Sequence, residues 1–234
     1  MTQISDIVLV PAISPPNAGK GTQIALFEEK HPGQVKSVVM GDMLREIASQ
    51  DSELGREIKS YIDVGKFAPL PTVLSALREG IGQTLEKYPS TRVIILDGFP
   101  RDLEQAQELQ LLCQEWNTKI AKVLYIDVKD EECLSRAVNR RYCKHCNKVF
   151  NLKTKPFENC GKSECDGQLI QRKDDVQEIA EGRLNTFHNL TDPILPFYKE
   201  HGVEIVSVDG QGDINDIAED VERHLAPVIT AGVS

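Results

Sequence analysis

The chain has 234 residues, of which 40% are hydrophobic and 27% charged, so it can build one substantial globular core with a small inserted module. Its formal net charge of −9 argues against nonspecific nucleic-acid binding, which needs a broad basic face. No apolar run approaches the roughly 20 residues that cross a bilayer. The first six residues, MTQISD, lack the regions of a signal peptide, so we expect a cytoplasmic protein that binds neither nucleic acid nor a membrane.

Short β-branched runs alternate along the chain with longer amphipathic segments. We predict strands at residues 7–10, 35–39, 93–96, 123–127 and 203–208. Helical periodicity fits residues 20–30, 42–49, 54–64, 72–87, 103–116, 131–140, 175–200 and 214–225. This alternation predicts an α/β fold, a five-stranded parallel sheet covered by helices on both faces. Ligands of such folds bind beyond the carboxyl ends of the strands.

The run Asn17-Ala18-Gly19-Lys20-Gly21-Thr22 joins the first predicted strand to the first predicted helix. In a phosphate-binding loop, backbone N–H groups at a helix N-terminus surround the phosphates, the lysine supplies a point charge, and the threonine hydroxyl can reach magnesium. The loop therefore predicts binding of a nucleoside triphosphate. It departs from the pattern G-x-x-x-x-G-K-[ST], because Ser14 replaces the first glycine and Gly21 separates Lys20 from Thr22.

Four of the six cysteines lie in a polar segment, from residue 142 to about residue 171, that interrupts the alternation. They form the pairs Cys143-x-x-Cys146 and Cys160-x4-Cys165, which match a structural zinc site with four thiolate ligands. A disulfide pair is disfavoured by the expected cytoplasmic location, and a redox Cys-x-x-Cys by the lack of a following helix. Because the second spacer is long, Asp166 or His145 could replace one thiolate.

Arginines concentrate in the second half of the chain, where Arg136, Arg140, Arg141, Arg172 and Arg183 lie, and Arg45 and Arg101 precede them. The guanidinium group offers a rigid fork of donors that suits phosphate. From the spacing alone, phosphate binding and solvated helix faces both stay open.

Further motifs follow in a fixed order. They are Gly41-Asp42-Met43-Leu44-Arg45, Gly65-Lys66, Leu96-Asp97-Gly98-Phe99-Pro100-Arg101 with Gln105, Arg136-x-x-x-Arg140-Arg141, Arg172-Lys173-Asp174-Asp175, and Arg183. With the phosphate loop and the cysteine insert, this series resembles the adenylate kinase family, in its long form with a zinc-bearing lid, over nearly the whole chain. The resemblance implies a core of residues 1–38, 69–138 and 176–234, a mobile acceptor-nucleotide domain at 39–68 and an inserted mobile lid at 139–175.

The same resemblance implies an activity. Family members transfer the terminal phosphoryl group of magnesium-bound ATP to AMP, giving two ADP. We therefore expect a P-loop kinase that works as a monomer, with ATP, AMP and ADP as its small-molecule partners, Mg²⁺ accompanying ATP, and a structural Zn²⁺ in the lid.

The resemblance also assigns roles to individual residues. ATP would be bound by Asn17, Ala18, Gly19, Lys20, Gly21, Thr22, Arg136, Arg140, Val149, Phe150 and Gly212. AMP would be bound by Met40, Arg45, Lys66, Phe67, Ala68, Gly98, Phe99, Pro100, Arg101, Gln105, Arg172 and Arg183. Lys20, Arg101, Arg140, Arg172 and Arg183 would be catalytic, Asp97 would orient magnesium through water, and Cys143, Cys146, Cys160 and Cys165 would hold zinc. Arg136 would stack on the donor adenine, and Gln105 would read the acceptor adenine.

Three positions depart from the family's usual pattern, which has glycine at positions 14 and 17 and threonine at position 40. Asparagine tolerates positive φ, so we expect Asn17 to keep the shape of the loop. Met40 could pack on a purine without a hydrogen bond, which keeps CMP, UMP or GMP as alternative acceptors. The two loop substitutions keep a non-catalytic nucleotide-binding regulator as another alternative.

Asp174 and Asp175 stand at the return of the predicted lid. They could pair with arginines as a hinge salt bridge, or one of them could cap the following helix.

Overall fold

The computed structural model describes residues 3–62, 68–146, 148–153, 160, 165–171 and 175–231, and the fold is built on a parallel sheet. Its strand order is β2-β3-β1-β5-β9, with bounds of Val8–Ile13 for β1, Val35–Val39 for β2, Val93–Asp97 for β3, Val123–Asp127 for β5 and Ile205–Asp209 for β9. All the pairings are parallel, which confirms the predicted five-stranded sheet. A two-residue strand that we did not predict, β4 (Lys119–Ile120), also pairs with β1.

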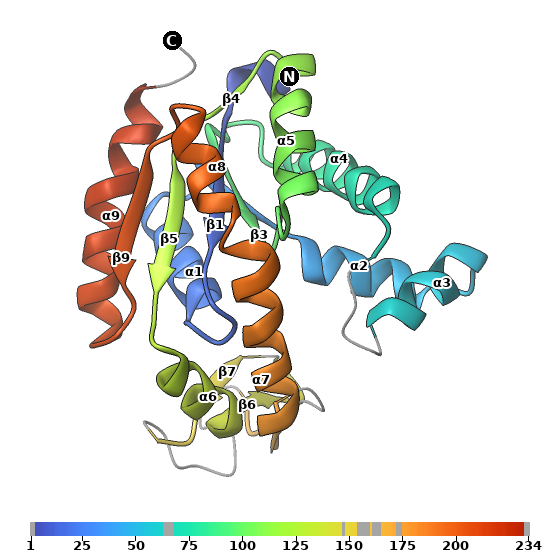
Figure 1. Cartoon of the computed structure of the whole chain (residues 1–234), viewed down its shortest axis with the longest axis vertical. Helices are drawn as coiled ribbons and strands as arrows, with labels where there is room; N and C mark the ends of the chain where they lie inside the picture. The colour runs from blue at the N-terminus through green and yellow to red at the C-terminus, as the bar shows by residue number, and fades with distance from the viewer. Residues whose placement is uncertain are drawn as a thin grey trace.

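Helices cover both faces of this sheet (Figure 1). Val8 and Val10 pack with α1 (Lys20–Lys30) and α9 (Ile214–Ala231) in a first hydrophobic cluster. The neighbouring Leu9 packs with α4 (Leu70–Lys87) and α5 (Leu103–Glu115) in a second cluster, because successive strand residues point to opposite faces. Both faces of β1 are buried, which explains its continuous apolar sequence.

The strand order reverses at β1. The chain leaves β1 toward β2 and β3 on one side, and later adds β5 and β9 on the other side. Such a switch point opens a crevice at the carboxyl ends of the strands. The loop of residues 14–19 lies at this point and leads into α1, as the position of the phosphate-loop motif predicts.

Two parts extend from the central sheet (Figure 1). The helices α2 (Met40–Ser49) and α3 (Glu53–Ile62) project on one side, within the predicted acceptor range 39–68. After α6 (Asp130–Asn139), a second, antiparallel sheet contains β6 (Arg140–Cys143), β7 (Val149–Asn151) and β8 (Leu169–Ile170), within the predicted lid range 139–175. The domain boundaries and the mobility of these parts stay predictions.

The single helix predicted at 175–200 is wrong. The structure has α7 (Gln177–Thr186), a π-helical turn η2 (Phe187–Thr191) and α8 (Ile194–Glu200). The backbone N–H of Asp192 donates to the carbonyl of Phe187 at 3.0 Å, an i→i+5 bond that leads into Pro193. Because proline lacks an N–H and its ring clashes with the carbonyl four residues earlier, the regular helix cannot continue through this position.

The last helix runs further than predicted. We expected it to end at Leu225, yet α9 continues through Pro227 to Ala231. Val228 is buried against the first cluster and Ile229 packs on it, so apolar burial beyond the proline favours the longer helix. The chain also contains a short 3₁₀ turn, η1 (Ile4–Asp6). No helix in the described part of the chain combines the length and the apolar character needed to cross a membrane.

Tyr198 on α8 provides a first test of the core. Its side chain is fully buried in a third cluster with Ile13, and within the described residues its hydroxyl has no hydrogen-bond partner. An unpaired buried hydroxyl costs about 1–3 kcal/mol, so Tyr198→Phe should raise the free energy of unfolding by about 1 kcal/mol. Urea denaturation would measure this, with Tyr61→Phe at a partly exposed position as the control. A destabilised Tyr198→Phe would show that the hydroxyl has a partner.

Candidate active site

The loop before α1 has the backbone of a phosphate-binding loop. Gly19 and Asn17 both have left-handed backbones, with φ of +94° and +66°. Asn17 thus adopts the positive φ that was expected of it. Ser14 has no positive φ, so no glycine is needed there, and its hydroxyl donates to the Pro15 carbonyl at 3.0 Å. The two departures from the usual motif are therefore compatible with the loop's shape.

Lys20 and Asp97 form an ion pair at the centre of this edge of the sheet. Lys20 begins α1 and Asp97 ends β3, and β1 and β3 pair so that Ala12 lies beside Asp97. The two side chains are only 16% and 18% exposed. A cation and a carboxylate meeting at a helix N-terminus can receive an anionic phosphate and a divalent metal ion respectively.

Arg136 on α6 joins the loop before α1 to the loop after β9. Its Nη1 donates to the Ala18 carbonyl at 2.9 Å and its Nη2 donates to the Gly210 carbonyl at 2.8 Å. Its Nε donates to Glu132 at 2.8 Å. These bonds lie in the plane of the guanidinium group, so its faces stay suited to stacking on a base. Gly212, with φ of +140°, follows in the same loop.

A second group of cations converges on Arg101, which follows β3. Its Nε donates to the Gly98 carbonyl at 2.9 Å, where Gly98 itself has φ of +80°. Burial lowers the pKa of Arg101, and the positive charges of Arg183 and Arg45 lower it further, while Asp97 opposes them. Arg183 comes from α7, and Arg45 comes from α2, where it also pairs with Asp42. Like charges at such a buried position favour the binding of an anion.

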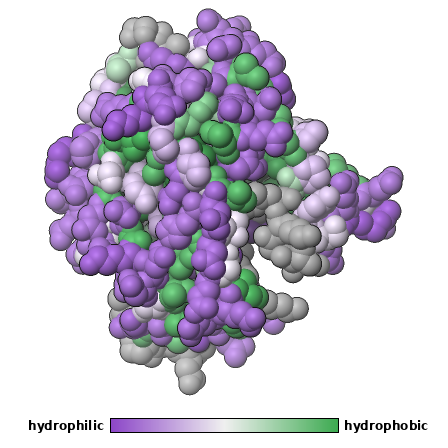
Figure 2. Space-filling view, in the orientation of Figure 1, coloured by the Kyte–Doolittle hydropathy of each residue, from purple (hydrophilic) through white to green (hydrophobic). Residues whose placement is uncertain are grey.

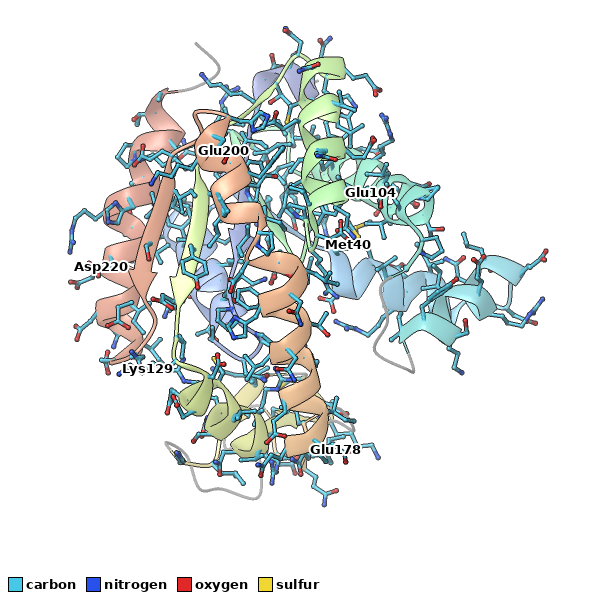
Figure 3. The ribbon with its side chains drawn as sticks, in the orientation of Figure 1. Met40, Glu104, Lys129, Glu178, Glu200 and Asp220 are labelled. Carbon is cyan, nitrogen blue, oxygen red and sulfur yellow. The ribbon has the colours of Figure 1, made fainter. Side chains whose placement is uncertain are left out.

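The structure places two predicted adenine contacts inside the protein. Gln105 is buried, accepts a hydrogen bond from the Arg101 backbone N–H at 2.9 Å and donates to Asp102 at 3.2 Å. Met40 is also buried, in the second cluster, and Figure 3 places it where α2 joins the core. In this structure both side chains support the site, and their contacts with AMP stay predictions.

The remaining predicted site residues are distributed as follows. Phe99 is buried in the second cluster, the Phe99–Pro100 peptide is cis, and Ala68 packs against that cluster. Val149 and Phe150 lie on β7 of the lid, one exposed and one buried. Lys66, Phe67, Arg172 and Asp174 lie outside the described residues. Figure 2 shows a recess on one face of the molecule between α7 and the projecting helices α2 and α3.

Arg140 and Asp175 connect the two ends of the lid. Arg140 begins β6, and its Nε donates to Asp175 Oδ2 at 2.9 Å while its Nη2 pairs with the other carboxylate oxygen. The Asp175 side chain is 1% exposed. The N-cap position of α7 is Val176, so of the two expected roles the structure shows Asp175 in the salt bridge and not at the cap, and a hinge at this bridge stays a prediction. Figure 3 labels Lys129 and Glu178, which mark the outgoing and returning sides of this region.

Asp175→Asn should destabilise the protein strongly. Removing one charge from a buried ion pair leaves the other uncompensated and costs about 3–5 kcal/mol. We expect the free energy of unfolding, measured by urea denaturation and circular dichroism, to fall by about that amount. Asp51→Asn is the matched control, since Asp51 pairs with Arg56 while fully exposed, and such pairs contribute about 0–1 kcal/mol. Equal effects of the two substitutions would contradict a buried ion pair between Arg140 and Asp175.

His188 forms a more exposed connection at the base of the lid. Its Nδ1 lies 2.8 Å from Asp192, and its Nε2 lies 3.0 Å from Asp130, the first residue of α6. These hydrogen bonds, that of Asp192 foremost, raise the pKa of His188 above its usual value. Only the protonated imidazole can donate to both carboxylates at once.

The stability of the chain should therefore depend on pH through His188. Because the folded pKa is raised, the stabilisation is fully present below the unfolded value of about 6.5 and is lost as pH rises through the higher folded value. The side chain is 43% exposed, so the effect should be at most about 1 kcal/mol. The difference in unfolding free energy between the wild type and His188→Gln should be largest near pH 6 and smallest near pH 9. A difference that grew with pH would contradict this assignment.

The four lid cysteines meet at one point. All their Sγ atoms lie within 4.8 Å of one another, with 3.5 Å between Cys143 and Cys165 and 3.6 Å between Cys146 and Cys160. A zinc ion with Zn–S bonds of about 2.3 Å predicts S···S distances of about 3.8 Å, so the group fits zinc. The cysteines are unbridged, and among the described residues neither His145 nor Asp166 belongs to the group.

The backbone of the first knuckle favours a thiolate. The N–H groups of Cys146 and His145 approach Cys143 Sγ at 3.5 and 3.4 Å, and these contacts, that of Cys146 first, lower the pKa of the Cys143 thiol to about 6. A thiolate is the form that binds a metal ion.

Two supporting residues of the site were not predicted from the sequence. Thr191 on η2 donates to the Arg101 carbonyl at 2.7 Å, and Gly210 supplies the carbonyl that receives Arg136. Both interactions join segments far apart in the chain and so leave no local pattern. Glu132, four residues before Arg136, could have been found from that helical spacing.

Comparison with known proteins agrees with this geometry. A family model described as adenylate kinase matches residues 12–203. An adenylate kinase of Archaeoglobus fulgidus is 35% identical over 217 residues, covering 92% of this chain and 97% of that protein. Adenylate kinases of Caldicellulosiruptor bescii and Listeria innocua are each 36% identical, over 90% of this chain and 95% of their own length. The chain belongs to the adenylate kinase family.

Proposed function

We propose that the chain transfers the terminal phosphoryl group of ATP to AMP, reversibly and with magnesium, giving two ADP. The observation that carries this proposal is the meeting of two cationic groups at one edge of the sheet. Lys20 lies at the N-terminus of α1, and Arg101 with Arg45 and Arg183 lies beside it, with Asp97 acting on both groups. A protein that binds a single nucleotide would need only the Lys20 group. A protein that transfers a phosphoryl group between two nucleotides needs both the Lys20 group and the Arg101 group.

The donor side follows from the loop before α1. The N-terminus of α1 offers backbone N–H groups to the ATP phosphates, and Lys20 exchanges Asp97 for a phosphate oxygen. Asp97 would then be free to hold magnesium through water, and the bound metal ion would supply positive charge to the donor phosphates. Arg136, fixed by three in-plane hydrogen bonds, presents a flat face for the donor adenine.

The acceptor side follows from the Arg101 group. Phosphoryl transfer passes through a loose transition state with charge on the equatorial oxygens, so catalysis consists mainly of alignment and electrostatic stabilisation. The like charges of Arg183 and Arg45 and burial all lower the pKa of Arg101, so the negative charge of AMP and the transferring group would favour this arrangement of cations. Closing the lid would exclude water, which would otherwise hydrolyse ATP, and would bring Arg140 and Arg172 toward the phosphates.

An acceptor panel tests the proposal. In a coupled assay of ADP formation with ATP and magnesium, AMP should give a higher kcat/KM than CMP, UMP or GMP. Met40, which motivated these other acceptors, is buried in the core, so no observation in the structure favours them. Faster turnover of another monophosphate would replace the adenylate assignment, and no turnover with any acceptor would leave a nucleotide-binding regulator.

We propose further that Cys143, Cys146, Cys160 and Cys165 hold one structural zinc ion. The support is their mutual distance and the donor set, which leaves no ligand position for a catalytic water. The chain would act as a cytoplasmic monomer, and sedimentation equilibrium of the purified protein tests the oligomeric state.

A further inference from the structure

We propose that Thr191 is a positioning residue for phosphoryl transfer, because it holds the main chain of Arg101 in place. The inference rests on the proposed function, in which Arg101 contacts the acceptor and the transferring phosphate. The Thr191 hydroxyl donates to the Arg101 carbonyl oxygen at 2.7 Å, across 90 residues of sequence. Thr191 is among the few polar side chains that are buried in the described part of the chain.

The Thr191 hydroxyl makes this bond in place of the usual hydrogen bond to a carbonyl of its own helical segment. A helical threonine commonly donates to the carbonyl four residues earlier, and Thr186 does so toward Gly182 at 2.9 Å, as Thr84 does toward Gly80. Thr191 instead donates to a residue outside its own helical segment. A buried hydroxyl with one long-range partner is a specific connection between two parts of the fold.

Both main-chain polar groups of Arg101 are hydrogen-bonded to side chains. Its N–H donates to Gln105 Oε1 and its carbonyl accepts from Thr191, so side chains from α5 and η2 fix the main chain between them. Its side chain is further tied back to the Gly98 carbonyl. A guanidinium group that must meet a phosphate within a few tenths of an ångström depends on such supporting contacts.

The π-helical turn explains how Arg183 and Thr191, on the consecutive segments α7 and η2, can both act on Arg101. Arg183 acts on Arg101 through its charge, and Thr191 follows it eight residues later. Eight residues of α-helix end about 80° beyond two full turns, which would place the two side chains on different faces. The wider turn of η2, closed by the Asp192 to Phe187 bond, advances less per residue and returns Thr191 toward the face of Arg183.

Removal of the hydroxyl alone tests the proposal. Thr191→Val should lower kcat/KM for AMP about five- to tenfold, with KM for ATP changed less than twofold, since only the acceptor side is displaced. Thr191→Ser, which keeps the hydroxyl, should restore kcat/KM for AMP to within twofold of the wild type. Thr186→Val, which removes a local bond of the same kind on α7, should leave both nucleotides unaffected.

A merely structural role would lower the melting temperature and the active fraction but would leave KM for AMP unchanged. A double-mutant cycle of Thr191→Val and Arg101→Ala is a second test, with the dissociation constant of AMP measured by calorimetry for each variant. In an Arg101→Ala background, Thr191→Val should change this constant less than twofold. The proposal is overturned if Thr191→Val matches the wild type in KM and kcat, or if its effect is undiminished without the Arg101 side chain.

The same measurements separate this inference from the proposed function. A wild type that turns over no acceptor refutes the proposed function, and the AMP dissociation constants of the wild type and Thr191→Val then decide the positioning role alone. An active wild type with an unaffected Thr191→Val refutes only the positioning role.

Discussion

Lys20→Ala should lower kcat for ADP formation from ATP and AMP by about 10²–10³-fold. Lys20 is the cation at the N-terminus of α1, and its ion pair with Asp97 places it where the ends of β1 and β3 meet. Charge that develops on the transferring group is stabilised by fixed cations, so loss of this one acts on the transition state more than on nucleotide binding. The coupled assay at saturating ATP and AMP measures kcat directly.

The matched control for this variant lies on the same helix. Lys30, the last residue of α1, is exposed and far along the helix from the phosphate loop, so Lys30→Ala should keep the wild-type kcat. Melting temperatures of both variants show whether each chain is folded. A folded Lys20→Ala with kcat within tenfold of the wild type would contradict the catalytic role given to Lys20. Stabilisation of the transferring group would then be assigned to the arginine group of Arg101.

Local patterns were sufficient to predict the central fold. The strands β1 and β3 have apolar runs that are buried, and β2, β5 and β9 are rich in β-branched residues with a few polar ones among them. The helices that alternate with these strands have amphipathic periods, so the parallel sheet and its helix layers follow from the sequence. The glycine-rich loop then locates the phosphate site at the end of the first strand. The positive φ of Asn17 also follows from residue chemistry, since asparagine adopts this conformation more readily than most residues.

What the sequence did not predict depends on contacts between distant segments. The extension of α9 through Pro227 arises because buried side chains such as Val228 outweigh the local preference of proline, whereas the break of the helix before Pro193 follows from the proline itself. The strands of the lid are only two to four residues long, too short to show an alternation, so their pairing is visible only in three dimensions. The inward position of Gln105, by contrast, is set locally, because its side chain accepts from the Arg101 N–H four residues earlier and its own N–H donates to the cap residue Asp102.

Removal of zinc should lower the melting temperature by about 10 °C while nucleotide binding to the core persists. The lid has almost no core of its own, because among its described residues only Cys143, Phe150 and Cys160 form a buried cluster, with Cys165 and Leu169 packed on it. A structural zinc site supplies folding free energy that such a segment lacks. If about 3–5 kcal/mol is lost, the scale of roughly 2–4 °C per kcal/mol for a chain of this size gives the expected shift.

The measurement combines elemental analysis, calorimetry and ATP binding before and after a chelator. Protein purified without chelator should contain about one zinc per chain, and finding none would overturn the four-cysteine assignment. Unchanged melting after the metal has been removed would show that the site contributes nothing to the stability of the fold.

Substitution of Gly167 should also reduce zinc binding and the melting temperature, without a chelator. A Cβ atom at Gly167 would lie 2.5 Å from Cys143 Sγ and 2.7 Å from His145 Cβ, so Gly167→Ala must displace the first knuckle. We expect this variant to hold less zinc and to melt at a lower temperature. Gly182→Ala on α7 is the control, since its added Cβ would meet no atom within 4 Å and alanine favours a helix. Full zinc content in Gly167→Ala would mean that the first knuckle shifts to accommodate a methyl group and still binds zinc through all its ligands. The tight packing of Gly167 on Cys143 would then not be needed to hold the thiolates together.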